Sequence, residues 1–166
     1  MMKKLLLILL CLPLLFGCGS EDTNNILQLN KRYDQLNRLA NYLEEEERKK
    51  IELWAQATKH LFENELYGDH SLAIRVISEK NNIPVILVDE LDTILESRNF
   101  QINTNEITPK FLRNKLNEIR KNGQDPIEIN ILGDKQWIYF DDSPFLRNLR
   151  NEMRMEQKYI LIEKRE

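Results

Sequence analysis

The sequence predicts an α+β fold in which one long N-terminal helix precedes a small antiparallel sheet with flanking helices. The long helix is indicated by the stretch from Ile26 to Tyr67, which contains no proline or glycine. Two pairs of short strand-like segments follow, each joined by a polar turn. After each pair comes a helix start with proline in its first turn. Hairpins with helices at one face of a sheet are typical of α+β domains, and four or five strands are the simplest assembly.

The first half of the long helix, expected over residues 26–66, carries an apolar seam with coiled-coil spacing. Its members are Ile26, Leu29, Tyr33, Leu36, Ala40 and Leu43. Intervals of three and four over nearly three heptads predict that this half pairs with another helix. Continuing the register places Glu47 and Lys50 on the seam, and apolar residues return one residue out of phase at Ile51 and Trp54. We therefore expect the second half to pack on a globular domain, with Trp54 against the sheet.

Residues 67–150 are expected to form that domain, beginning with a short helix and a hairpin. Asp69 or Ser71 could cap the helix, which should turn Leu72 and Val76 inward, with Ala73 and Ile77 as further candidates. The segment 83–89 is apolar on both faces, so it should be a central strand. A short acidic break separates it from its expected partner, the segment 93–100.

A helix capped by Thr108 and a second hairpin should complete the domain. Residues 126–131 alternate between apolar and polar, which indicates a half-buried strand, and the aromatic segment 136–140 should be its return strand. Ser143 is expected to cap the last helix. Its apolar face should consist of Phe145, Leu146, Leu149 and Met153. Residues 151–166 are expected to be a charged helical tail, in which Tyr159–Ile162 could be a short strand or a frayed helix end.

The N-terminus has the organisation of a secretion signal. Two lysines precede an apolar run of twelve residues, 5–16, which is short for a membrane-spanning helix but typical of a signal-peptide core. The run ends in Leu15-Phe16-Gly17-Cys18, which resembles the lipobox of bacterial lipoproteins. This resemblance implies that residues 1–17 are removed after Gly17 and that Cys18 carries a diacylglyceryl group and a further acyl chain such as palmitate. An uncleaved membrane anchor is the alternative.

Residues 18–25 are predicted to be a polar tether. Gly19, directly after the lipidated cysteine, gives no reason for retention in the inner membrane. The predicted location is therefore the bacterial outer membrane, facing the periplasm or the cell surface. The pair Glu21-Asp22 resembles the surface-export tethers of lipoproteins in the Bacteroidetes, although an ordinary solvated linker is an equal alternative.

Composition excludes several classes of partner and chemistry. Without residues 1–17 the chain has 22 basic and 27 acidic residues, a net charge of −5, which argues against nucleic acid or an anionic lipid surface as a partner. Cys11 leaves with the signal and Cys18 is acylated, so no disulfide is expected. His60 and His70 are the only histidines and stand in no zinc-binding motif, and five glycines leave no phosphate loop. We expect no enzyme activity, no metal site and no cofactor.

Two polar or aromatic groupings remain as candidate sites. Asp141 and Asp142 could hold a cation, but adjacent acids in a strand point to opposite faces, so a role in the turn is favoured. Trp137 and Tyr139 could line a ligand cleft, although packing in the core is the favoured alternative.

Three further motifs occur in order along the chain: EEERKKIELWAQAT at 45–58, NIPVILVD at 82–89 and KQWIYFDDSPFLRNLR at 135–150. Together they resemble the extracytoplasmic sensor region of a group of sensor histidine kinases in the Bacteroidetes, over roughly Glu44 to Arg150. The resemblance implies a minimal PAS- or Cache-like fold, here without kinase domains, because the residues after Arg150 are too polar to span a membrane.

The function expected from the sequence is therefore that of a membrane-anchored lipoprotein with a non-enzymatic, sensor-like domain accessory to extracytoplasmic signal sensing. Its ligand is unknown. The seam would pair two copies, or one copy with the matching helix of a sensor kinase. The alternatives are a structural or surface-binding lipoprotein with no signalling role, and the product of a truncated sensor kinase gene. A hydrolase is disfavoured because the sequence shows no nucleophile or metal motif.

Overall fold

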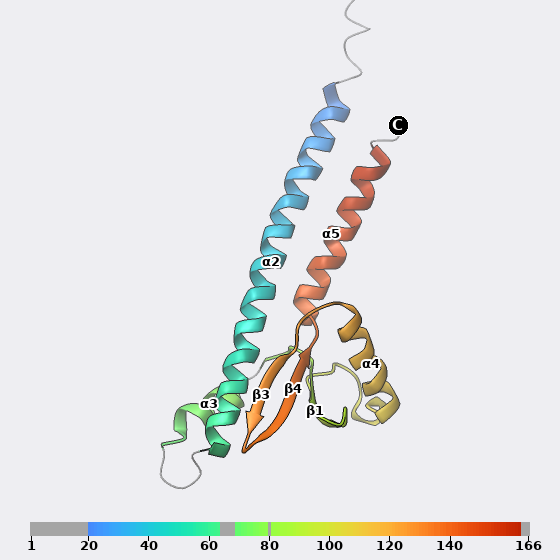
Figure 1. Ribbon diagram of the computed structural model, residues 1–166. Helices are drawn as coiled ribbons and strands as arrows, with labels where there is room; N and C mark the ends of the chain where they lie inside the picture. Colours follow the sequence, from blue (N-terminus) through green and yellow to red (C-terminus); the bar gives the residue numbers. More distant parts are fainter. Residues whose placement is uncertain (1–19, 64–68, 80, 164–166) are drawn as a thin grey trace, which may run out of the picture. The chain divides into compact units, whose positions relative to one another are not determined.

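A computed structural model describes residues 20–63, 69–79 and 81–163 of the chain (Figure 1). The α+β class is confirmed. The elements in chain order are α2 (Ser20–Glu63), α3 (Ser71–Ser78), β1 (Val85–Asp89), β2 (Ile94–Arg98), the 3-10 turn η2 (Thr104–Glu106), α4 (Pro109–Lys121), β3 (Ile127–Ile131), β4 (Asp134–Phe140) and α5 (Pro144–Glu163). Gly17 and Cys18 lie outside the described residues, so cleavage and lipidation stay predictions.

The chain forms two compact units. One, which we call the sheet unit, is Tyr42–Arg147; the other, the helix-pair unit, combines Met1–Asn41 with Asn148–Glu166. These borders differ from those expected at 66/67 and 150/151. The second half of α2 belongs to the sheet unit because its apolar residues lie in the core of that unit. The expected border after Arg150 falls inside α5, which continues without a break to Glu163.

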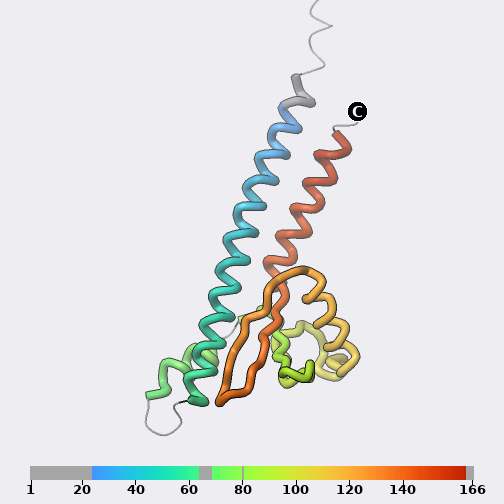
Figure 2. The backbone as a smooth tube through the Cα atoms, in the orientation of Figure 1, coloured from blue at the N-terminus to red at the C-terminus, as the bar shows by residue number. Residues whose placement is uncertain are grey.

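The four strands form one antiparallel sheet in the order β2-β1-β4-β3. The expectation that residues 83–89 form a central strand is confirmed, since Val85 of β1 pairs with Arg98 of β2 and with Phe140 of β4. The β3–β4 hairpin, visible in Figure 2, turns through Leu132 and Gly133, whose φ values are 55° and 100°. Two consecutive left-handed residues match the twist of the flanking strands.

Both faces of the sheet are covered, which corrects the expectation of helices at one face. On one face Ile51, Trp54 and Ala55 of α2 are buried with apolar residues of β1, β3 and β4. On the other face Leu116 and Ile119 of α4 are buried with Ile86 and Val88 of β1. The cause is β1 itself: it is apolar at every position from Val85 to Val88, and successive side chains point to opposite faces.

Helix caps follow the sequence at α4 and α5 but not at α3. Thr108 accepts a hydrogen bond from the Phe111 N–H, as a cap does. For α3 the N-cap is His70, and Asp69 accepts from the Ser71 N–H instead. Leu72 is 71% exposed, and the buried residue of α3 is Ala73, whose small side chain permits close packing.

Phe145 is likewise exposed, to 59%, and not part of the apolar face of α5. At about 100° per residue, Leu146, Leu149 and Met153 share one face of a helix, whereas Phe145 lies well to one side of it.

The helix-pair unit contains the first half of α2 and most of α5. Helix α2 begins at Ser20, inside the predicted tether. Arg32 of α2 contacts Glu152 and Glu156 of α5 at 2.6 and 2.9 Å, and the two helices run antiparallel in this unit (Figure 1). Residues 151–163 are helical, as predicted for the charged tail, and two of them, Glu156 and Ile160, are buried. The segment Tyr159–Ile162 is helical and not a strand.

The seam is only partly covered. Ala40 is fully buried, while the other five members, Ile26, Leu29, Tyr33, Leu36 and Leu43, are half-buried. Pairing of the seam between chains stays a prediction. Among the described helices none combines the length and the apolar character needed to cross a bilayer.

Candidate functional site around Trp54 and Glu47

Two hollows lie beside Trp54 in the sheet unit, where α2 faces the connection from α3 to β1. Their volumes are about 140 and 190 Å³. Both are lined by Trp54, Glu79 and Asn81. The first is also lined by Glu47 and Lys50, and the second by Arg98 and Asn99. Each exceeds the space that one water molecule needs, yet each is smaller than a typical pocket for a drug-sized ligand.

Trp54 forms a fixed wall between these hollows. It is 8% exposed and belongs to the core cluster of the sheet, which confirms the expectation that it packs there. The Arg98 guanidinium carbon lies 5.2 Å from the centroid of its ring, a distance typical of a cation–π contact. The aromatic ring is thus held by the core on one side and by a cation on another.

Asn81 and Asn99 close the far side of the site. The Asn99 amide nitrogen donates to the Asn81 side-chain oxygen at 2.8 Å and to the Ile83 carbonyl at 2.9 Å. The Ile83 N–H donates to the same Asn81 oxygen at 3.3 Å. Asn99 has φ 64°, a left-handed conformation that asparagine tolerates better than most residues. These bonds fix the α3–β1 connection against the end of β2.

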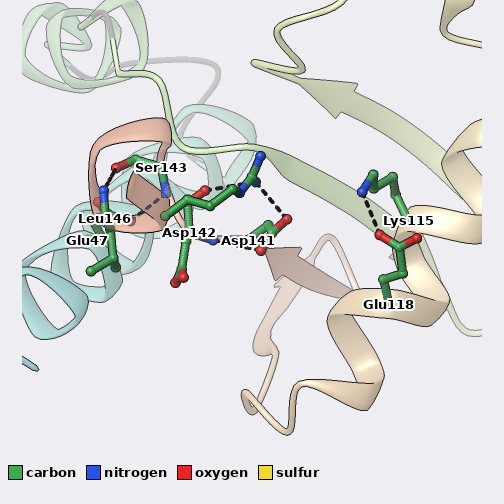
Figure 3. A network of polar contacts seen from close by, with 8 residues as sticks. Glu47, Lys115, Glu118, Asp141, Asp142, Ser143 and Leu146 are labelled. Carbon is green, nitrogen blue, oxygen red and sulfur yellow. Dashed lines mark hydrogen bonds and ion pairs between the residues drawn. The ribbon is translucent and has the colours of Figure 1, made fainter. Parts of the chain in front are cut away.

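Glu47 is the buried charged residue of the site, only 9% exposed. Its Oε2 accepts a hydrogen bond from the Ser143 N–H at 3.0 Å (Figure 3). The Ser143 Oγ in turn accepts from the Leu146 N–H at 3.2 Å. In a capping box both bonds arise within one helix terminus. Here Ser143 caps α5 as the sequence predicted, but the carboxylate comes from α2.

Asp141 and Asp142 reinforce the start of α5. The Asp141 carboxylate accepts from Arg147 at 2.9 Å and from the Asp142 N–H at 2.9 Å, and the Asp142 carbonyl accepts from Arg147 at 3.2 Å (Figure 3). The favoured role of this pair in the turn is confirmed. Within the described residues no group of three or more histidine, cysteine or acidic side chains could hold a metal ion.

Trp137 and Tyr139 lie on the opposite face of the sheet, the one covered by α4. Tyr139 packs against the buried cluster there, and the Arg120 guanidinium carbon lies 4.7 Å from its ring centroid. Arg120 also pairs with Asp92 at 2.6 Å, and this hydrogen bond lowers the pKa of the Asp92 carboxyl below its ordinary value. Neither aromatic residue lines the hollows described above.

The two hollows were not predicted from the sequence, although two features of the sequence indicated their position. Glu47 stood on the continued register of the seam, where a charge must find a buried partner or leave the seam. Ile51 and Trp54, one residue out of phase with the seam, are both buried in the core of the sheet unit.

Comparisons with known proteins found no match to this chain among protein-family models, curated proteins or solved structures. The likeness to kinase sensor regions rests on the three sequence motifs alone.

Replacing Glu47 should destabilise the fold. In Glu47→Ala the buried Ser143 N–H loses its acceptor, so we expect a loss of about 1–3 kcal/mol in the free energy of unfolding. Glu47→Gln keeps an acceptor oxygen and should lose less. The matched control is Glu45→Ala on the same helix, whose side chain is 67% exposed and pairs with Lys49 at the surface. It should change stability by about 0.5 kcal/mol or less. Urea unfolding measures all three, and equal losses in Glu47→Ala and Glu45→Ala would contradict the role of the buried bond.

Proposed function

We propose that this chain is a membrane-anchored lipoprotein whose sheet unit is a non-enzymatic, sensor-like domain, accessory to extracytoplasmic signal sensing through ligand or partner binding. One observation carries the proposal: the hollow beside Trp54 is lined by Glu47, the carboxylate that caps α5. An occupant of that hollow would therefore touch the contact that links α2 to α5.

The chemistry of the hollow suits a small polar occupant. Glu47, Lys50 and Glu79 supply charges of both signs, and Trp54 and Ile83 supply apolar surface. An occupant that draws the Glu47 carboxylate toward itself would weaken the cap on α5, and one that holds it in place would strengthen the cap. Only an occupant with different affinities for the two arrangements can shift the balance between them.

The sequence motifs support the same contact. Glu47 and Trp54 lie in the first kinase-like motif, and Ser143 lies in the last. A four-stranded antiparallel sheet with a long preceding helix over one face also agrees with the PAS- or Cache-like fold that the resemblance implies.

The helix-pair unit is where a change in the cap of α5 would reach a partner protein. Both α2 and α5 extend into this unit from the sheet unit. Because α5 leaves most of the seam half-buried, apolar surface remains for a second copy or for the matching helix of a kinase.

The proposed lipidation of Cys18 can be tested directly. The protein should incorporate labelled palmitate and sediment with bacterial membranes, and Cys18→Ser should lose both properties, since acyl chains on that sulfur and amine provide the anchor. Cys11→Ser is the matched control, because Cys11 is expected to leave with the signal. Label retained by Cys18→Ser would contradict the lipoprotein assignment.

Pairing through the seam makes a second prediction. A cysteine at Leu36, on the seam, should form a disulfide-linked dimer or an adduct with a kinase when membranes carrying the protein are mildly oxidised. A cysteine at the exposed neighbour Gln35 should not. Non-reducing gel electrophoresis with mass spectrometry reads the result, and the absence of both products for Leu36→Cys would refute pairing through this seam.

A further inference from the structure

Four successive apolar residues lie just before Glu163, the last residue of α5. They are Tyr159, Ile160, Leu161 and Ile162. Ile160 is buried, but Tyr159, Leu161 and Ile162 are 52, 53 and 45% exposed. One turn earlier, Met155 is 51% exposed on the face that Tyr159 and Ile162 share. A helix at a protein surface in water normally shows one apolar stripe, so apolar residues all round indicate a second apolar environment.

This apolar end lies close to the start of α2. Tyr159 and Glu163 line one hollow together with Asn25, Gln28 and Leu29. Because a helix rises about 1.5 Å per residue, Asn25 lies roughly 7.5 Å along α2 from Ser20. Only Cys18 and Gly19 precede Ser20 in the predicted mature chain, and two residues reach at most about 7 Å. The acyl chains on Cys18 would thus hold Asn25 within about 15 Å of the lipid, and the apolar end of α5 lines the same hollow as Asn25.

We propose that Tyr159, Leu161 and Ile162 form a membrane-docking surface that inserts shallowly into the interface of the bilayer to which Cys18 is anchored. The inference rests on the proposed function, because it takes Cys18 as acylated. The occupant is the lipid surface and not a second copy, because the position of the lipid is set by the adjacent anchor. Tyrosine suits this depth, since its ring is apolar and its hydroxyl stays in contact with water.

The net charge around the docking surface is compatible with contact with lipid. The mature chain is acidic overall, but residues 158–166 contain three basic and two acidic residues. Insertion of apolar side chains needs no anionic lipid, so the docking surface should engage zwitterionic membranes. A lipid anchor alone lets a domain swivel, whereas two contacts fix which side faces the membrane.

The test uses the acylated full chain in phosphatidylcholine vesicles, with a polarity-sensitive dye on Ile162→Cys. This cysteine would be the one reactive thiol of the mature protein, since Cys18 is acylated. The matched control is Leu39→Cys, 43% exposed on α2 and roughly 28 Å along the helix from Ser20. We expect lipid-borne quenchers to remove most of the emission at position 162 and to leave position 39 unchanged.

Flotation of the vesicles separates the possible outcomes. Protein that floats but is not quenched at position 162 overturns the docking surface and leaves the lipoprotein assignment standing. A blue-shifted emission without quenching, as a second copy would produce, overturns it equally. Protein that fails to float overturns both, because the docking surface depends on the anchor.

Discussion

The hydrogen bond between the Glu47 carboxylate and the Ser143 N–H is the contact on which the sheet unit most depends. A buried carboxylate is strongly disfavoured unless donors satisfy it. Here the donor is the N–H of Ser143, the N-cap residue of α5, where the partial positive charge of a helix N-terminus also favours an anion. The bond joins residues 96 positions apart and so sets where the chain leaves β4 to start α5. The Asp141–Arg147 pair then supports that start from the other side.

The remaining architecture follows from a sheet that has to be covered on both faces. Because β1 is apolar on both sides, α2 and α4 are both required, and the wide Trp54 ring takes its place between α2 and the sheet. Where α2 meets the α3–β1 connection, polar side chains replace apolar packing, and the hollows arise there. The site thus lies where the core ends, with one wall formed by the buried cap of α5.

Local signals in the sequence predicted the local features of this fold. Period-two alternation, proline and the capping residues Thr108 and Ser143 placed the strands and the helix starts, since each depends on neighbouring residues. Features that depend on distant residues were not predictable in this way. The acceptor for the Ser143 N–H is Glu47, 96 positions away in the chain, and the first half of α2 shares a compact unit with the distant residues of α5. Tyr139 packs against the buried cluster of α4 and lies under Arg120, and a ligand cleft lined by Trp137 and Tyr139 stays a prediction.

Amide hydrogen exchange at Ser143 tests the central claim, that a carboxylate of α2 holds the start of α5, most directly. A buried N–H with a fixed acceptor exchanges only when the surrounding structure opens. The account predicts slow exchange at Ser143 in the native protein and in Glu45→Ala, and fast exchange in Glu47→Ala under conditions where β1 stays protected. Fast exchange at Ser143 in the native protein, or exchange unaffected by the loss of Glu47, would contradict it.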